Sequence, residues 1–143
     1  MKIHKIGSHE FRLGRDSNGV VQIEAPDSNT FAAAMGFVHA RDRITQLMLV
    51  RLAGQGRLCE CLKDSEDTYE IDVFMRELGF GSQAREEVHK LSESAREYCE
   101  SYCEGINYYM NHHSRPLEFL LVGYHPEPWS VADTLITIKL MGY

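Results

Sequence analysis

The chain of 143 residues lacks the features of several common classes of protein. Its longest apolar stretch, residues 31–38, is far shorter than the roughly 18 residues that a membrane-spanning helix needs. It carries 15 basic against 21 acidic side chains, a formal net charge of −6. A nucleic-acid-binding domain would show clustered Lys and Arg and a basic balance. We therefore expect neither a membrane nor a nucleic acid as a partner.

The N-terminus also lacks a secretory signal. Lys2 and Lys5 are basic, but the roughly 7–15 consecutive apolar residues of a signal peptide do not follow them. If Met1 is the native start, we expect a cytoplasmic protein. If a signal peptide has been removed, we expect a periplasmic one, and the sequence leaves both locations open.

The cysteines do not form a recognisable framework. Pairs so close in sequence rarely meet disulfide geometry, and zinc needs about four nitrogen or sulfur ligands at characteristic spacings. We expect four reduced thiols and no metal site. A cytosolic zinc protein that uses the cysteines with His112 and His113 is the alternative. The two close pairs are Cys59 with Cys61, and Cys99 with Cys103.

Motifs for catalysis are missing as well. The sequence has no phosphate-binding loop, dinucleotide fingerprint, G-x-S-x-G elbow or H-E-x-x-H helix. Asp42 and Arg43 lie in an expected helix, and with Arg57 and Glu60 we assign them to structure, as ion pairs and caps. No single stretch supports catalysis by this chain alone.

A β-hairpin is predicted at residues 10–25. Phe11 and Leu13 alternate with polar residues, Asn18-Gly19 suits a tight turn, and the apolar run at 20–23 returns. An isolated two-stranded hairpin is marginally stable. We therefore expect it to join a larger sheet that this chain does not contain.

The remainder of the chain is predicted to be helical. The clearest helix has apolar residues at spacings of three and four, and the last one opens with a capping box at Ser130 and Asp133. The fold class is an α-rich chain with an N-terminal β-hairpin, one unit over residues 1–143. In order, we expect a helix at 30–53 broken near Gly36 or Arg41, an acidic loop at 63–70, a short helix at 73–78, a helix at 92–112, an extended stretch at 124–129 and a helix at 131–140.

Four blocks of sequence, taken together and in order, are distinctive. Together they resemble the amino-terminal (α) portion of the penicillin acylase family of N-terminal-nucleophile (Ntn) hydrolases, with Arg41 where that family usually has glutamine. The blocks are GRDSNGVVQI at 14–23; GFVHARDRITQL with RLAGQGRLCE within 36–60; Asp72, Arg76 and Leu78-Gly79 with YCEGIN at 102–107; and PLEF at 116–119 with Gly123, PEPW at 126–129 and Asp133.

The resemblance implies a specific architecture and chemistry. This chain would be the α part of a heterodimeric Ntn-hydrolase α/β/β/α sandwich, produced when a zymogen cleaves itself autocatalytically. The nucleophilic Ser would be the N-terminus of a separate β subunit, so no catalytic residue is expected in this chain. The reaction would be cleavage of linear amides of N-acyl compounds, such as β-lactam side chains (antibiotic metabolism) or N-acyl homoserine lactones.

The resemblance also implies where substrate would bind. The last helix leads into the acyl-group pocket of the family, so Leu140, Met141 and Tyr143 are the candidate substrate-binding residues, with plain packing on the β chain as the alternative. The chemistry requires no cofactor, although family members hold a structural calcium ion. The alternative function is a non-catalytic fragment or homologue, without the nucleophile, that binds an acyl compound or a protein.

Overall fold

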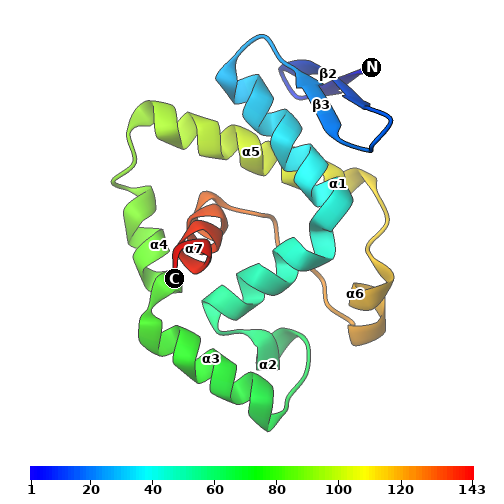
Figure 1. Cartoon of the computed structure of the whole chain (residues 1–143). Helices are drawn as coiled ribbons and strands as arrows, with labels where there is room; N and C mark the ends of the chain where they lie inside the picture. The colour runs from blue at the N-terminus through cyan, green and yellow to red at the C-terminus, as the bar shows by residue number, and fades with distance from the viewer.

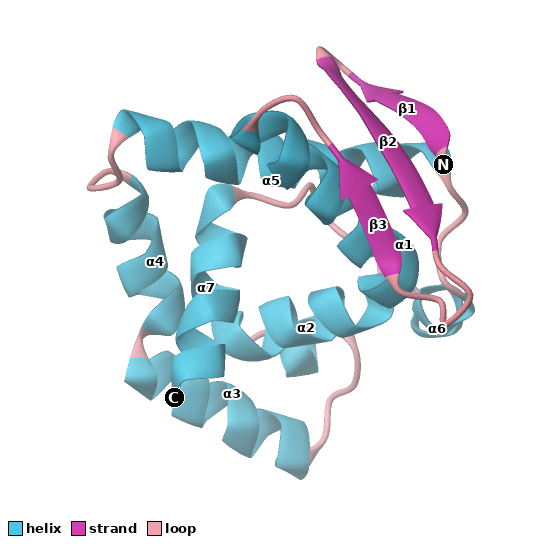
Figure 2. Ribbon diagram, turned by 45° about the horizontal axis from the view of Figure 1, so that its top comes forward, coloured by secondary structure: helices cyan, strands magenta, loops and turns pink.

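The computed structural model describes residues 1–143 as a small antiparallel sheet followed by seven helices. The sheet lies at one end, against α1 and α5, and α7 lies inside the arc that α1, α3, α4 and α5 form (Figures 1 and 2). The elements are β1 (Lys2–Ile6), β2 (His9–Arg15), β3 (Val21–Glu24), α1 (Ser28–Gln55), α2 (Leu58–Cys61), α3 (Glu66–Leu78), α4 (Phe80–Val88), α5 (Glu93–His112), α6 (Leu117–Val122) and α7 (Val131–Gly142).

The sheet has three strands in the order β1-β2-β3. The predicted hairpin is β2–β3, in which Arg15 pairs with Val21. The strand β1 was not expected, because its sequence is short and rich in basic side chains, and it becomes a strand by pairing with β2 from Lys2–Leu13 to Ile6–His9. The expectation that the hairpin finds its added strand only outside this chain is therefore wrong.

The helix α1 begins and ends as its sequence suggests but bends elsewhere. Asp27 is the N-cap and accepts a hydrogen bond from the backbone N–H of Thr30 at 2.8 Å. The helix ends at Gly56, whose backbone is left-handed. The kink lies at Arg43 (φ −144°, ψ 28°), just beyond the expected break at Arg41.

Gly36 does not break α1 but allows it to touch α5. A Cβ on Gly36 would lie 2.0 Å from the carbonyl oxygen of Tyr102, and one on Gly105 would lie 2.0 Å from that of Ala33. The two helices therefore meet backbone to backbone, and only glycine fits at the crossing. The neighbouring alanines of α1 are fully buried: Ala32, Ala33 and Ala34.

Four helical segments differ from the expectation. The predicted loop at 63–70 contains the start of α3, where Ser65 and Thr68 form a capping box and Glu66 and Asp67 lie in the first turn. Acidic residues there stabilise a helix through its dipole, so the acidic run marks a helix start rather than a loop. The helices α2, α4 and α6 were not expected, whereas α5 and α7 confirm their predictions, including the capping box at the start of α7.

Two apolar clusters form the core, and both include residues of α1. None of the helices combines the length and apolar composition that a membrane span needs. All four cysteines are free, and Cys103 is buried. The first cluster lies between the sheet and the first half of α1: Ile6, Phe11, Leu13, Ala34, Phe37 and Val38. The second lies between α1, α5 and the segment before α7: Ala40, Met48, Leu52, Cys103, Ile106, Phe119, Tyr124 and Trp129.

Candidate functional site

The three predicted substrate-binding residues lie at the end of α7, but they differ in exposure. Leu140 is half-buried and packs on α1, where a Cβ on Gly54 would come within 2.8 Å of its Cδ1. Met141 is 84% exposed and Tyr143 is 76% exposed. The structure thus brings Leu140 into the interior and leaves the other two side chains on the surface.

The start of α7 is fixed by a buried carboxylate. Asp133 accepts hydrogen bonds from the backbone N–H of Ser130 at 2.9 Å and from its hydroxyl at 2.8 Å. The side-chain amide of Gln55 donates to the other oxygen of Asp133 at 2.7 Å. Asp133 therefore caps its own helix and joins it to the end of α1.

Arg51, near the C-terminal end of α1, is only 2% exposed and completes this anchor. Its guanidinium donates to the carbonyl oxygen of Glu127 at 3.0 Å and to the hydroxyl of Tyr124 at 2.8 Å. It also lies 3.7 Å from the carboxylate of Asp133 and 5.5 Å from the ring centre of Trp129. One buried cation thus holds the whole segment between α6 and α7.

Sequence reasoning missed the role of Arg51, although a signal was present. Arg51 shares the buried face of α1 with Met48 and Leu52, at a position where helical spacing demands an apolar residue. A charged side chain is seldom buried without partners, so this spacing predicts a buried polar network.

Trp129 is held from the other side by α5. Asn107 donates to the carbonyl oxygen of Trp129 at 2.9 Å and accepts from its backbone N–H at 2.7 Å. The indole N–H donates to the hydroxyl of Thr134 at 2.9 Å. Because the backbone N–H and carbonyl groups of Trp129 are both hydrogen-bonded, the extended segment before α7 is fixed without belonging to any sheet.

The other sequence blocks also meet in space. Asp72, from α3, accepts from the backbone N–H groups of Leu58 at 2.8 Å and Cys59 at 2.9 Å. Arg76 donates to the carbonyl oxygen of Gly56 at 2.8 Å. These residues cap the short helix α2 and the end of α1, so their role is structural.

Asp42 links the first block to the second. It forms ion pairs with Arg15 and Arg41. Partial burial opposes ionisation of Asp42, but hydrogen bonds from Arg41 and Arg15 outweigh it and hold the pKa of this carboxyl below its ordinary value. The structural assignment of Asp42 is confirmed.

The remaining predicted ion pairs are found except one. Arg57 pairs with Glu60 at 2.8 Å and with Glu127 at 2.9 Å. The hydrogen bond from Arg57 lowers the pKa of Glu60. Arg43 takes part in none of the ion pairs within this chain and is the residue at which α1 kinks, so a pair of Arg43 with a partner chain stays a prediction.

No group of three or more His, Cys, Asp or Glu side chains is placed to hold a metal ion. His112 and His113 each bond through Nδ1 to a carbonyl oxygen one turn earlier, at 2.8 and 3.1 Å, and stack on Tyr108 and Tyr109. The residues of this chain therefore do not fit the zinc alternative, which needs about four such ligands together.

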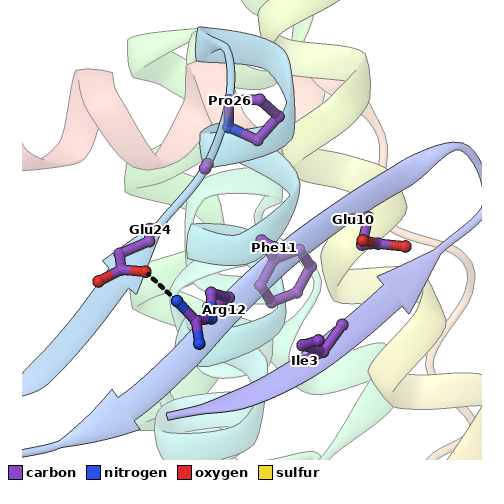
Figure 3. A pocket seen from close by; sticks show the side chains of 7 residues that line it. Ile3, Glu10, Phe11, Arg12, Glu24 and Pro26 are labelled. Atoms are coloured by element: carbon purple, nitrogen blue, oxygen red, sulfur yellow. Dashed lines mark hydrogen bonds and ion pairs between the residues drawn. The ribbon is translucent and has the colours of Figure 1, made fainter.

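A shallow hollow of about 370 Å³ lies on the sheet (Figure 3). An exposed ion pair of Arg12 with Glu24, at 3.3 Å, crosses it. This hollow lies on the sheet, whereas the C-terminal end of α7 lies next to α4, away from the sheet (Figure 1). It is lined by Ile3, Glu10, Phe11, Arg12, Glu24, Ala25 and Pro26.

Comparison with known proteins agrees with this arrangement. A sequence model described as penicillin amidase matches residues 11–143. The chain is 31% identical over 132 residues, 92% of its length, to the penicillin acylase 2 proenzyme of Pseudomonas sp. (strain SE83). It is 30% identical over 133 residues, again 92% of its length, to the acyl-homoserine lactone acylase QuiP of Pseudomonas aeruginosa. It spans only 17% and 16% of the lengths of these two relatives.

The fold has a solved counterpart. The thermostable penicillin G acylase from Alcaligenes faecalis superposes with a TM-score of 0.80 and 21% sequence identity, over 90% of this chain and 70% of that one. The α-rich fold with its N-terminal antiparallel sheet is therefore shared with a penicillin G acylase. Since the match over residues 11–143 takes in all four sequence blocks that the structure joins, the chain belongs to the penicillin amidase family.

Proposed function

We propose that this chain is the α-subunit portion of a self-processed amidohydrolase that cleaves linear amides of N-acyl compounds. The observation that carries the proposal is the family match over residues 11–143. Similar proteins are named acylases, and one is named a proenzyme. The chain corresponds to 17% of that proenzyme, which leaves room in a longer precursor for a chain with the nucleophile.

The reaction would divide its parts between two chains. A Ser at the N-terminus of the β chain attacks the amide carbonyl, and its own α-amine takes the hydroxyl proton as general base. Hydrogen-bond donors of an oxyanion hole, also on the β chain, stabilise the tetrahedral intermediate. This chain then contributes binding of the acyl group rather than chemistry.

The end of α7 would supply that binding. Leu140 packs on Gly54, while Met141 and Tyr143 are exposed and free to contact a partner chain or a ligand. Apolar and aromatic side chains suit an acyl group, and the thioether of a methionine adapts to groups of different shape. The anchor at Arg51 and Asp133 fixes the helix that presents them.

The test is intact-mass spectrometry with N-terminal sequencing of protein purified from the complete native gene. We expect a second, larger chain that begins with Ser, present one to one with this chain. We also expect hydrolysis of at least one N-acyl amide by this pair. A single species without the second chain would overturn the proposal and leave an acyl-compound-binding or protein-binding fragment.

Substitution of Ala for the first Ser of the second chain provides the matched control. The variant loses the nucleophile and should accumulate as an uncut, inactive precursor. Retained hydrolysis in this variant would show that the nucleophile lies elsewhere and would contradict the division of roles.

A further inference from the structure

The exposed ring of Tyr143 is held along one edge by two phenylalanines. Its centre lies 6.3 Å from that of Phe74, with the planes at 63°, and 5.8 Å from that of Phe80, with the planes at 73°. These are edge-to-face contacts within the distance range that favours aromatic pairs. The residue as a whole remains 76% exposed.

The two phenylalanines come from different helices and meet because of a glycine corner. Phe74 lies in α3 and Phe80 is the first residue of α4. Gly79 ends one helix and begins the next with a φ of 71°, a conformation that favours glycine. The corner turns the chain so that a ring from each helix lies next to the ring of Tyr143.

The helix turn before Tyr143 is held by α4 as well. Lys139 pairs with Glu87 at 2.9 Å, and its ammonium lies 3.5 Å from the side-chain oxygen of Gln83. Both partners belong to α4, which therefore fixes the end of α7 at Lys139 as well as at Tyr143.

From this geometry we propose that Phe74 and Phe80 are positioning residues that orient the ring of Tyr143 and thereby select the acyl group by its size. The inference rests on the proposed function, since it deepens the role given to Tyr143. Two edge contacts restrict the rotamers of Tyr143 and leave its other surface for a ligand. If either ring is lost, Tyr143 can turn, and the space beside it changes size.

The test uses the assembled two-chain protein and five probes, the p-nitroanilides of acetic, butanoic, hexanoic, octanoic and phenylacetic acids. Phe74→Leu and Phe80→Leu keep apolar volume but remove the aromatic edge. We expect the ratio of kcat/KM for the bulkiest against the smallest acyl group to change about tenfold, the scale of pocket discrimination by size. The value of kcat for the acetyl probe should stay within about twofold.

Two further variants separate positioning from general packing. Phe80→Tyr keeps an aromatic ring at this position and should therefore keep the kcat/KM ratio of the unsubstituted protein. Tyr69→Leu removes an aromatic side chain from α3 that is 62% exposed and lies outside the aromatic contacts of Tyr143, and it should leave the ratio unchanged. An unchanged ratio in both leucine variants, or a parallel loss with every probe, would overturn the inference.

Amide hydrogen exchange makes the positioning claim independent of hydrolysis. Exchange of residues 139–143 should be faster in Phe80→Leu than in Tyr69→Leu, because the last turn of α7 loses a contact. If the unsubstituted protein hydrolyses no probe, the proposed function fails. Equal exchange in the two variants would instead refute the role of Phe80 in holding Tyr143.

Discussion

The two halves of α1, on either side of the kink at Arg43, are specified by opposite means. The first half meets α5 through glycine and alanine, so that backbone touches backbone at Gly36 and Gly105. The second half reaches its neighbours through a long charged side chain, Arg51. Small residues fix where two helices cross, whereas Arg51 fixes where the next helix starts. The second half, through Arg51 and Gln55, thus fixes the start of the helix that presents Met141.

The largest expected effect comes from a substitution that disrupts the contact between the first half of α1 and α5. In Gly105→Val, the new Cβ would lie 2.0 Å from the carbonyl oxygen of Ala33, which is backbone and cannot rotate away. Overpacking in cores costs about 1–3 kcal/mol and occasionally more, and we expect the upper end or beyond because backbone must move. The measurement is the yield of folded protein and the midpoint of urea unfolding.

Gly142→Ala is the matched control, because a Cβ there has no atom within 4 Å. It should unfold at the same or slightly higher urea concentration, since Ala favours a helix more than Gly does. If Gly105→Val were as stable as this control, the helices would not meet backbone to backbone.

The next largest effect is expected from a substitution of Arg51 in the second half of α1. Arg51→Met keeps much of the side-chain volume but leaves Asp133 buried without its cation. Removing one partner of a buried pair costs about 3–5 kcal/mol. Arg51→Lys should recover little, because an ammonium cannot reach the carbonyl oxygen of Glu127 and the hydroxyl of Tyr124 in the same fork.

The pair of Arg12 and Glu24 provides the control for burial. Both side chains are largely exposed, at 60% and 58%. Arg12→Met should therefore cost less than about 1 kcal/mol in unfolding free energy. Equal losses in Arg12→Met and Arg51→Met would show that the network around Arg51 contributes no more than a surface ion pair.

The same contrast explains what could be predicted from the sequence. The hairpin at Asn18-Gly19, the helix α5 and the capping box at Ser130 depend on residues close in the chain, and all were predicted. The strand β1 depends on pairing with β2, and α4 on the corner at Gly79, so local patterns did not show them.

The candidate site divides in the same way. That Leu140, Met141 and Tyr143 share the end of one helix follows from their spacing and could be predicted. That Phe74 and Phe80 meet Tyr143 could not, because three separate elements must first be packed. The role of Arg51 lies between these cases, since its position on an apolar face was visible but its partners were not.

A smaller effect is expected at the corner between α3 and α4. Gly79→Ala places a Cβ on a residue with a φ of 71°, which costs about 1–2 kcal/mol for an L-residue in the left-handed region. No backbone lies among the nearest atoms to that Cβ, so strain rather than a clash is the cause. Thermal unfolding should show a modest loss, well below that of Gly105→Val.

The smallest expected effect is a loss of stability at acidic pH that arises in the first half of α1. His39 is half-buried, and its Nδ1 lies 2.9 Å from the hydroxyl of Tyr102 on α5. Burial lowers the pKa of His39, an effect that Asp42 only partly opposes. The unfolded chain therefore takes up the proton first as the pH falls below about 6.5, and stability declines there. Urea unfolding between pH 7 and pH 5 should show this loss, and His39→Gln should reduce it.

Exposed His125 is the control, and His125→Gln should leave the pH dependence unchanged. The second half of α1 should not share this dependence, because the guanidinium of Arg51 stays charged throughout. Burial opposes ionisation of Glu127, but the hydrogen bond from Arg57, a backbone hydrogen bond and the charges of Arg57 and Arg51 together lower the pKa of Glu127, so it also stays ionised at pH 5. If hydrogen exchange at pH 5 rose around Arg51 before it rose around His39, the two halves of α1 would not differ as their residues indicate.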